Sequence, residues 1–368
     1  MKRERPTPIW IKIAQWITIL LIAIYLLSAF IGYADPRHCG FLAIAGLAYP
    51  IILIMAILSA LLWLLIRWRF ALLPFAALLI TIPQITAFSP IHYNRFWSGR
   101  KDGDFAMMTY NTFSFNGKER TNKIVNEILK YDADFVCLQE VPKIRFFKYR
   151  MDKKHLELLK RSYPYMEDSD STSMCCFSKK PVRTVYSYHD DKYFAFCVYE
   201  TEVLGNKAFV FNVHLESIGL TREDKKLYMK LTSVKSKDKS LRGVRSRLMT
   251  KLSNAFKNRA GQAEMIRATL DSIRTDNPEA EIFVCGDFND TPYSYSYLTI
   301  KGRMHDAYSD AGIGPTHTYN ANRFYFHIDQ MLYDNKRIEA ISTRRGNSRA
   351  SDHYPIICLF RKKDNQNN

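Results

Sequence analysis

Three long apolar stretches near the N-terminus limit what this chain can fold into. They run from about Trp16 to Tyr33, from Phe41 to Ile66 and from Phe70 to Phe88. A helix needs about 20 apolar residues to cross the hydrocarbon core of a bilayer, and each stretch approaches or exceeds that length. Polar residues do not alternate with the apolar ones, so helices here would have no face suited to water. The sequence therefore predicts a membrane anchor of about three transmembrane helices in residues 1–95.

Two other interpretations of these stretches stay open. The first stretch follows Lys2, Arg3 and Arg5, which is also the pattern of a cleaved signal peptide. The third stretch contains Pro74 and Pro83, so it could be a bent or interfacial helix that does not fully span a bilayer. The two apolar stretches that follow the first favour an anchor over a signal peptide.

Basic residues in short loops predict the orientation of the anchor. A basic cluster at residues 2–5 precedes the first stretch, and Arg67 and Arg69 separate the second stretch from the third. Such clusters stay on the cytoplasmic side of a membrane. The chain after Phe88 is therefore expected to lie in the periplasm or outside the cell.

From Asp104 onward, short β-rich runs are separated by helical periods, and we expect residues 96–368 to form one domain. The predicted strands are Phe105–Tyr110, Phe135–Gln139, Met174–Ser178, Phe194–Thr201, Ala208–His214, Ile282–Cys285, Gln330–Tyr333 and Ile356–Phe360. The predicted helices are Arg120–Tyr131, Lys153–Ser162 and Ala255–Thr275.

Polar residues gather at the ends of the predicted strands. In chain order these motifs are Asn111, Gln139-Glu140, His214, Gly286-Asp287-Phe288-Asn289, His327-Ile328-Asp329 and Ser351-Asp352-His353. Taken singly, Asn111 or Asn289 could simply end a strand or cap a helix. Carboxylate, amide and imidazole groups that repeatedly meet strand ends instead favour one shared cleft.

These side chains suit the hydrolysis of a phosphate ester. That reaction needs a cation held by oxygen ligands, a base for water, and donors to the phosphoryl oxygens and the leaving group. Glu140 and Asp352 are hard oxygen ligands of the kind that Mg²⁺ prefers. Asp287 could accept a proton from the attacking water, and the amide of Asn289 could hold that water or a phosphoryl oxygen.

Two histidines could supply the donors. His214 and His353 can each donate to phosphate or to the departing oxygen. Asp329 could orient one of them and keep it protonated, because a nearby carboxylate raises the pKa of an imidazole.

The order of these motifs resembles the endonuclease/exonuclease/phosphatase superfamily, which includes deoxyribonuclease I, AP endonucleases, neutral sphingomyelinases and inositol-polyphosphate 5-phosphatases. Its most specific parts here are GDFNDTP at residues 286–292 and SDHYP at residues 351–355. The resemblance implies a four-layered α/β sandwich, with two mixed β-sheets face to face and helices outside. Together with the apolar helices, it resembles membrane-anchored bacterial members, which implies a multi-pass protein of the bacterial inner membrane.

The resemblance also implies roles for individual residues and a cofactor, Mg²⁺ or Mn²⁺. It implies Asn111 and Glu140 at the metal and phosphate, Asp352 near the metal, His214 as general acid, Asp287 as base, Asn289 as a ligand of phosphate or water, and His353 on the scissile phosphate, paired with Asp329. A histidine at the end of its strand, like His214, resembles the deoxyribonuclease I, sphingomyelinase and phosphatase branches rather than AP endonucleases.

The charge of the chain favours an anionic partner. Net charge is +17, from 53 Lys and Arg against 36 Asp and Glu. Nucleic acid, a phospholipid surface and a phosphorylated substrate all fit this charge. The segment Arg222–Arg259 carries thirteen basic residues against three acidic ones. It could bind lipid or a polyanionic substrate, or it could be a solvated helix face and loop.

Five of the seven cysteines lie inside short apolar runs and are predicted to be buried thiols; these are Cys137, Cys176, Cys197, Cys285 and Cys358.

The function that these observations favour is a metal-dependent phosphodiesterase, either nuclease-like or similar to phospholipase C and sphingomyelinase. A phosphomonoesterase acting on a soluble phosphorylated metabolite would use the same groups, so it stays open. A non-catalytic, membrane-anchored binding protein is a third hypothesis.

Overall fold

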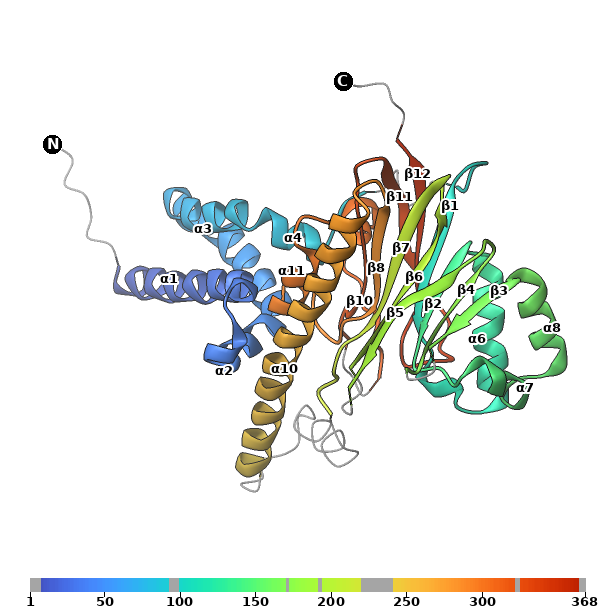
Figure 1. Ribbon diagram of the computed structural model, residues 1–368. Helices are drawn as coiled ribbons and strands as arrows, with labels where there is room; N and C mark the ends of the chain where they lie inside the picture. The colour runs from blue at the N-terminus through green and yellow to red at the C-terminus, as the bar shows by residue number, and fades with distance from the viewer. Residues whose placement is uncertain are drawn as a thin grey trace.

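The structure is a computed structural model that describes residues 8–92, 99–169, 172–190, 194–219, 241–321 and 325–363. Helices at the N-terminal end extend away from an α/β body, as Figure 1 shows. The predicted boundary between anchor and catalytic domain, at residues 95 and 96, lies outside the described residues and stays a prediction.

The N-terminal part is entirely helical between residues 9 and 88, apart from short turns. Its helices are α1 (Ile9–Phe30), a 3-10 turn η1 (Ile31–Tyr33), α2 (Pro36–Leu47), α3 (Tyr49–Ile80) and α4 (Ile82–Phe88). The predicted second stretch thus divides, because its first residues form α2 rather than part of the long helix. The predicted third stretch divides between the end of α3 and α4.

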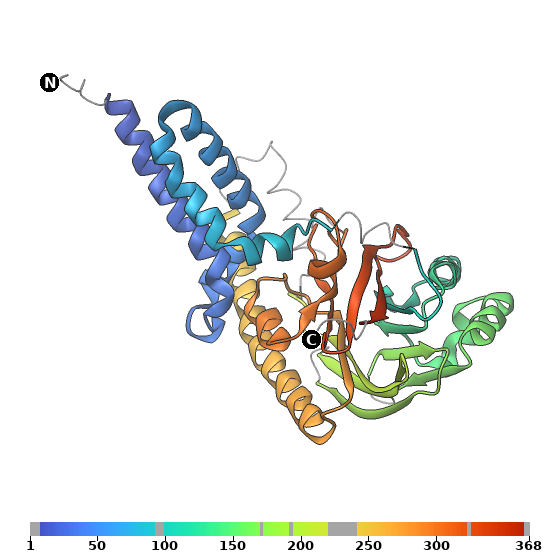
Figure 2. The same cartoon turned by 90° about the horizontal axis from the view of Figure 1, so that it is seen from above.

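The helix α3 folds back on itself at Arg67, whose φ of −152° and ψ of 87° are not helical. Leu53 and Ala77, which lie on opposite sides of this break, belong to one buried cluster. Trp63 and Ala71, closer to the break, belong to another. Figure 2 shows the two halves running side by side with α1. The three predicted apolar helices are therefore present as α1 and the two halves of α3.

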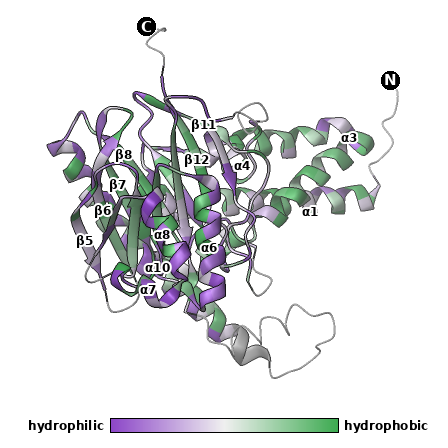
Figure 3. Cartoon of the chain, turned by 90° about the vertical axis from the view of Figure 1, so that its right-hand side faces the viewer, coloured by the Kyte–Doolittle hydropathy of each residue, from purple (hydrophilic) through white to green (hydrophobic). Residues whose placement is uncertain are grey.

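Two helices, Ile9–Tyr33 and Tyr49–Ile80, are long and apolar enough to cross a membrane. Most of their residues are hydrophobic, as the colouring in Figure 3 shows. Trp16 is 71% exposed and Leu65 is 87% exposed. A contiguous apolar surface of this kind on a soluble protein would be unfavourable in water, whereas lipid would cover it at little cost.

The α/β part contains two six-stranded sheets. One has the strand order β11-β12-β1-β2-β4-β3 and the other β5-β6-β7-β8-β10-β9. Both are mixed, because β1/β2 and β7/β8 are parallel pairs and their other neighbours are antiparallel. The strands are β1 (Phe105–Asn111), β2 (Phe135–Gln139), β3 (Tyr165–Asp168), β4 (Met174–Ser178), β5 (Arg183–His189), β6 (Ala195–Val203), β7 (Asn206–His214), β8 (Glu281–Asp287), β9 (His305–Asp306), β10 (Asp329–Tyr333), β11 (Ile338–Arg345) and β12 (Ile356–Lys362).

The two sheets face each other across one apolar core. Met107 and Cys137 from the first sheet pack there with Cys285 and Met331 from the second. All five cysteines predicted to be buried are buried, and so is Cys175.

Helices cover the outer faces of both sheets. The first sheet is covered by α6 (Lys118–Tyr131) and α8 (Lys153–Ser162), the second by α10 (Leu241–Asp276) and α11 (Tyr295–Lys301). Shorter helices are η2 (Phe113–Phe115), η3 (Ile144–Phe146), α7 (Phe147–Arg150) and α12 (Ala307–Ala311). The predicted four-layered sandwich is confirmed.

The sequence did not predict β3, β5, β9 or β11. Both β5 and β11 contain a bulge, between Thr184 and Tyr186 and between Ala340 and Ser342. A bulge shifts the two-residue alternation of side chains, so no regular pattern marks these strands. The predicted helix at Ala255 begins earlier, at Leu241.

Candidate active site

The parallel strand pairs bring the predicted site residues to one edge of the sandwich. In the first sheet Asn111 pairs with Gln139, so Glu140 follows beside Asn111. In the second sheet His214 pairs with Asp287. The carboxyl ends of β1, β2, β7 and β8 therefore meet, and their polar side chains face one another across the gap between the sheets.

Asn111 connects the two sheets at this edge. Its Nδ2 donates to Oε1 of Glu140 at 3.1 Å and to Oδ2 of Asp287 at 2.9 Å. Its Oδ1 accepts from the backbone N–H of Phe113 at 3.1 Å, which fixes the orientation of the amide. The Asn111 side chain is fully buried, so it holds the two carboxylates at a defined separation.

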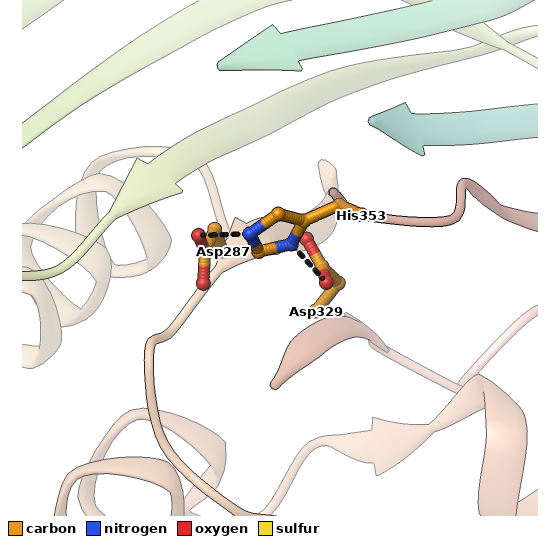
Figure 4. Close-up of side chains that lie close together, drawn as sticks. All are labelled: Asp287, Asp329 and His353. Atoms are coloured by element: carbon orange, nitrogen blue, oxygen red, sulfur yellow. Dashed lines mark hydrogen bonds and ion pairs between the residues drawn. The ribbon is translucent and has the colours of Figure 1, made fainter. Parts of the chain in front are cut away.

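His353 lies between two carboxylates, as Figure 4 shows. Its Nδ1 is 2.8 Å from Oδ2 of Asp329, and its Nε2 is 3.6 Å from Oδ2 of Asp287. Burial disfavours the charged imidazole, but the two carboxylates outweigh burial and raise the pKa of His353 to about 10. His353 is therefore an imidazolium at neutral pH.

The backbone at Asp329 is held in place by the side chain of Thr318. The Thr318 hydroxyl oxygen accepts from the N–H groups of both Ile328 and Asp329, each at 3.0 Å. The Asp329 side chain is fully buried, and its Oδ1 has no hydrogen-bond partner among the described residues. Thr318 is a supporting residue that the sequence analysis missed, since a lone threonine in a loop gives no recognisable signal.

Asp287 is almost as enclosed as Asp329, at 1% exposure. Burial raises its pKa and the Asp329 carboxylate adds to the rise, against the opposing charges of His353 and His214. A carboxylate with a raised pKa is a stronger base than an ordinary one. Asp287 is therefore suited to take a proton from water.

His214 lies within reach of the same carboxylates. Its Nε2 is 3.6 Å from Oε1 of Glu140 and 3.8 Å from Oδ2 of Asp287. Asn289 is also at the site, with its backbone N–H donating to Oδ1 of Asp287 at 2.8 Å. The Asn289 side chain donates to the carbonyl of Leu215 at 2.9 Å, and its φ of +49° is one that asparagine adopts more readily than most residues.

The residues present fit a divalent cation near Glu140 and Asp352. Burial raises the pKa of Asp352, and the carboxylates of Glu140 and Asp287 raise it further against the charge of His353. This crowding of carboxylates would be relieved by a cation, and oxygen ligands of this type suit Mg²⁺.

Ligand atoms of Asp287, Asp329 and His353 also lie within 4.8 Å of one another. That group is a poorer metal site. A histidine binds a metal through a neutral imidazole, and His353 is charged at neutral pH.

A network of buried side-chain amides joins the strands next to the site. Gln139 Nε2 donates to Oδ1 of Asn212 at 2.6 Å and to the hydroxyl of Thr109 at 3.0 Å. Asn212 Nδ2 donates to the carbonyls of Leu138 and Cys175, at 3.1 and 3.3 Å. The network joins β1 and β2 to β7, just before each strand reaches its site residue. The sequence analysis missed Asn212, although a polar residue inside an apolar strand was a visible signal.

The basic segment Arg222–Arg259 is only partly described, because residues 220–240 lie outside the described residues. One of its members is not on a surface. Arg259 is 1% exposed, and its Nε lies 3.2 Å from Oδ2 of Asp290. Its charge is neutralised inside the protein, so it does not contribute to a surface for lipid or polyanions.

The sequence profile of the Endonuclease/Exonuclease/phosphatase family matches residues 108–353, and the chain belongs to this family. Residues 11–88 match a second profile, described as Domain of unknown function (DUF8431). None of the curated proteins compared with the chain matches it. The family match contains the strand-end residues from Asn111 to His353, and the second profile covers the N-terminal helices.

Solved structures share the fold. TDP2 from C. elegans is 19% identical with a TM-score of 0.50, over 72% of this chain and 76% of that chain. The human Nocturnin catalytic domain with bound sulfate anion is 17% identical with a TM-score of 0.49, over 72% and 97%. An endonuclease/exonuclease/phosphatase from Bacteroides vulgatus is 16% identical with a TM-score of 0.45, over 71% and 99%. At 19% identity and a TM-score of 0.50, the likeness to TDP2 from C. elegans concerns the fold alone.

Proposed function

We propose that this protein is a divalent-metal-dependent phosphodiesterase anchored in a membrane. The observation that carries the proposal is a continuous chain of contacts at the edge of the sandwich, from Glu140 through Asn111 and Asp287 to His353. Membership of a family named for endonucleases, exonucleases and phosphatases supports phosphate-ester chemistry in general.

Glu140 and Asp352 would hold Mg²⁺ or Mn²⁺, with Asn111 orienting Glu140 and contributing at the metal and phosphate. When bound, the cation supplies positive charge to the phosphoryl oxygens. Asp287 takes a proton from the attacking water, and Asn289 holds that water or a phosphoryl oxygen. The raised pKa of Asp287 supports its role as the general base.

The two histidines would act on the phosphoryl oxygens and on the leaving group. His353, kept positively charged by Asp329, donates to a phosphoryl oxygen and stabilises the charge that grows there in the transition state. His214 lies close enough to the same carboxylates to reach the leaving oxygen and protonate it. A diester and a monoester both release an alkoxide, so this acid would serve either substrate, and the monoester control below separates the two.

The helices α1 and α3 would span the membrane in three passes. Arg67 and Arg69 lie at the break in α3, and basic residues at such a turn favour the cytoplasmic side. The α/β part would then face the periplasm of a bacterial cell, from its inner membrane. The partner class is a phosphate ester, in nucleic acid, in a phospholipid headgroup or in a phosphorylated metabolite.

The test is hydrolysis of bis-p-nitrophenyl phosphate by the full chain in detergent micelles or nanodiscs, with Mg²⁺ or Mn²⁺. p-Nitrophenyl phosphate serves as the monoester control. Asp287→Ala and His353→Ala should each lower kcat by about 10²–10⁴-fold, as loss of a general base or a charge stabiliser does. Lys130→Ala, on the outer helix α6, is the matched control and should leave kcat unchanged. Wild-type rates in both site variants would overturn the proposed roles.

A further inference from the structure

The helical anchor touches the α/β part along α10. Gly40 of α2 lies so close to α10 that a Cβ there would come within 2.4 Å of the Ser253 hydroxyl oxygen and 3.0 Å of the Ser253 carbonyl oxygen. Arg37 of α2 forms an ion pair with Glu264 of α10, with Nη1 donating to Oε2 at 2.9 Å. Figure 1 shows α2 beside α10.

A second contact reaches the loop that follows β8. Gly32 of η1 lies against this loop so closely that a Cβ would be 2.1 Å from the backbone oxygen of Tyr293. The Tyr293 ring packs at 4.7 Å from the ring of Tyr49 in α3. Tyr293 belongs to the same buried cluster as the anchor residues Tyr25 and Tyr49. The loop that carries Asn289 therefore continues directly into the anchor interface.

The helix α10 in turn holds the loops after both β7 and β8. Arg259 Nε donates to Oδ2 of Asp290, and its Nη1 donates to the backbone oxygen of Glu216, each at 3.2 Å. Gln262 accepts from the Glu216 N–H at 3.0 Å, and Asn258 donates to the Glu216 carboxylate at 3.1 Å. We call these three α10 side chains, Asn258, Arg259 and Gln262, the clamp.

The clamp acts immediately next to the proposed chemistry. Glu216 follows His214 by two positions, and Asp290 follows Asn289. The Asp290 carboxylate is also fixed by the hydroxyl of Ser296 at 2.6 Å. His214 and Asp287 are already neighbours in the β7/β8 pair, and the clamp fixes the loops that follow them, including the loop that carries Asn289.

We infer that the anchor is a positioning element of the active site, acting through its contacts with α10 and with the Tyr293 loop. This inference rests on the proposed function and assigns a role to the helical region, residues 11–88, beyond attachment. The anchor packs against α10, and the clamp ties α10 to both site loops, so a shift of the anchor would move α10 and with it both loops. Displacements on the order of 1 Å can cost about 10²-fold in rate.

The test compares three glycine variants of the full chain in nanodiscs. Gly32→Ala and Gly40→Ala insert a methyl group at the two close approaches, so each should lower kcat by about 10-fold or more, with KM changed less than kcat. Gly46→Ala is the matched control, because its Cβ would meet the Ile31 side chain inside the anchor, at 3.2 Å, and no part of the α/β body. It should leave kcat within about 2-fold of wild type.

A milder variant covers the case in which a glycine variant does not fold. Arg37→Ala removes the ion pair with Glu264 at a side chain that is 45% exposed, so folding should survive. Hydrogen exchange should become faster at residues 214–219 and 288–296 in Arg37→Ala and in the folded glycine variants. Wild-type kcat together with unchanged exchange in these variants would overturn the inference. An inactive wild-type protein would instead contradict the proposed function.

Discussion

His353 Nδ1 lies 2.8 Å from Oδ2 of Asp329, and both side chains are almost fully shielded from solvent. In a buried setting an isolated imidazole would lose its proton, but this one gains a carboxylate partner on each side. The His353 imidazole therefore keeps its proton at the edge where the two sheets meet, and it faces the carboxylate of Asp287. The pH dependence of the reaction should follow from this arrangement.

Asp329→Asn should move the basic limb of the pH–rate profile to lower pH. The wild-type pKa of His353 is about 10, so the imidazolium is present below that pH and is lost above it. Without the Asp329 carboxylate, fewer negative charges oppose the effect of burial, so the pKa of His353 falls, by about 1–3 for loss of an adjacent opposite charge. The measurement is kcat/KM from pH 6 to 11. An unmoved basic limb would show that His353 does not set it.

Asn111→Asp should move the acid limb to higher pH. The pKa of Asp287 is already raised by burial, while the Asn111 amide lowers it by donating to Oδ2. A carboxylate at position 111 removes that donor and adds a like charge, so both changes raise the pKa of Asp287. The base is then deprotonated only at higher pH. The measurement is kcat/KM from pH 4 to 8 at saturating metal. An acid limb that stays at the same pH or moves to lower pH would contradict Asp287 as the base.

Asn212→Leu should destabilise the fold. The substitution removes one of the two acceptors of Gln139 Nε2, the one at 2.6 Å, and the donor to two buried carbonyls. Buried polar groups that lose their partner cost about 1–3 kcal/mol. Urea or thermal unfolding in micelles measures the change, with Lys207→Ala on the exposed part of the same strand as the control. Equal stability of the Asn212→Leu variant and wild type would show that the network contributes little.

Strands that carry the site were predictable because each is an apolar run that stops at a polar residue. β2 ends at Gln139 and β8 ends at Asp287, so the site residues could be named in order. The contact of Asn111 with Asp287 was not predictable, since it depends on how two separate sheets pack. The same holds for Gly32 against Tyr293, which joins segments far apart in the chain.

Burial of a charge could not be read from the sequence either. Arg259 ends a basic segment, and nothing in its neighbours distinguishes it from a solvated side chain. Its ion-pair partner, Asp290, is buried and belongs to the GDFNDTP motif. A residue in a run of basic residues is normally expected at the surface. Arg259 is buried because α10 packs on the loop that follows β8.

The central claim is that Glu140 and Asp352 hold a cation that the reaction requires. It is tested most directly by titrating Mg²⁺ and Mn²⁺ into the metal-free full chain while following bis-p-nitrophenyl phosphate hydrolysis, for wild type and for Glu140→Gln. The account predicts no turnover in EDTA, recovery with added metal, and at least about a 10-fold higher metal requirement in Glu140→Gln, as loss of one charged ligand implies. Full activity of the wild-type protein in EDTA, or an identical metal requirement in both proteins, would contradict it.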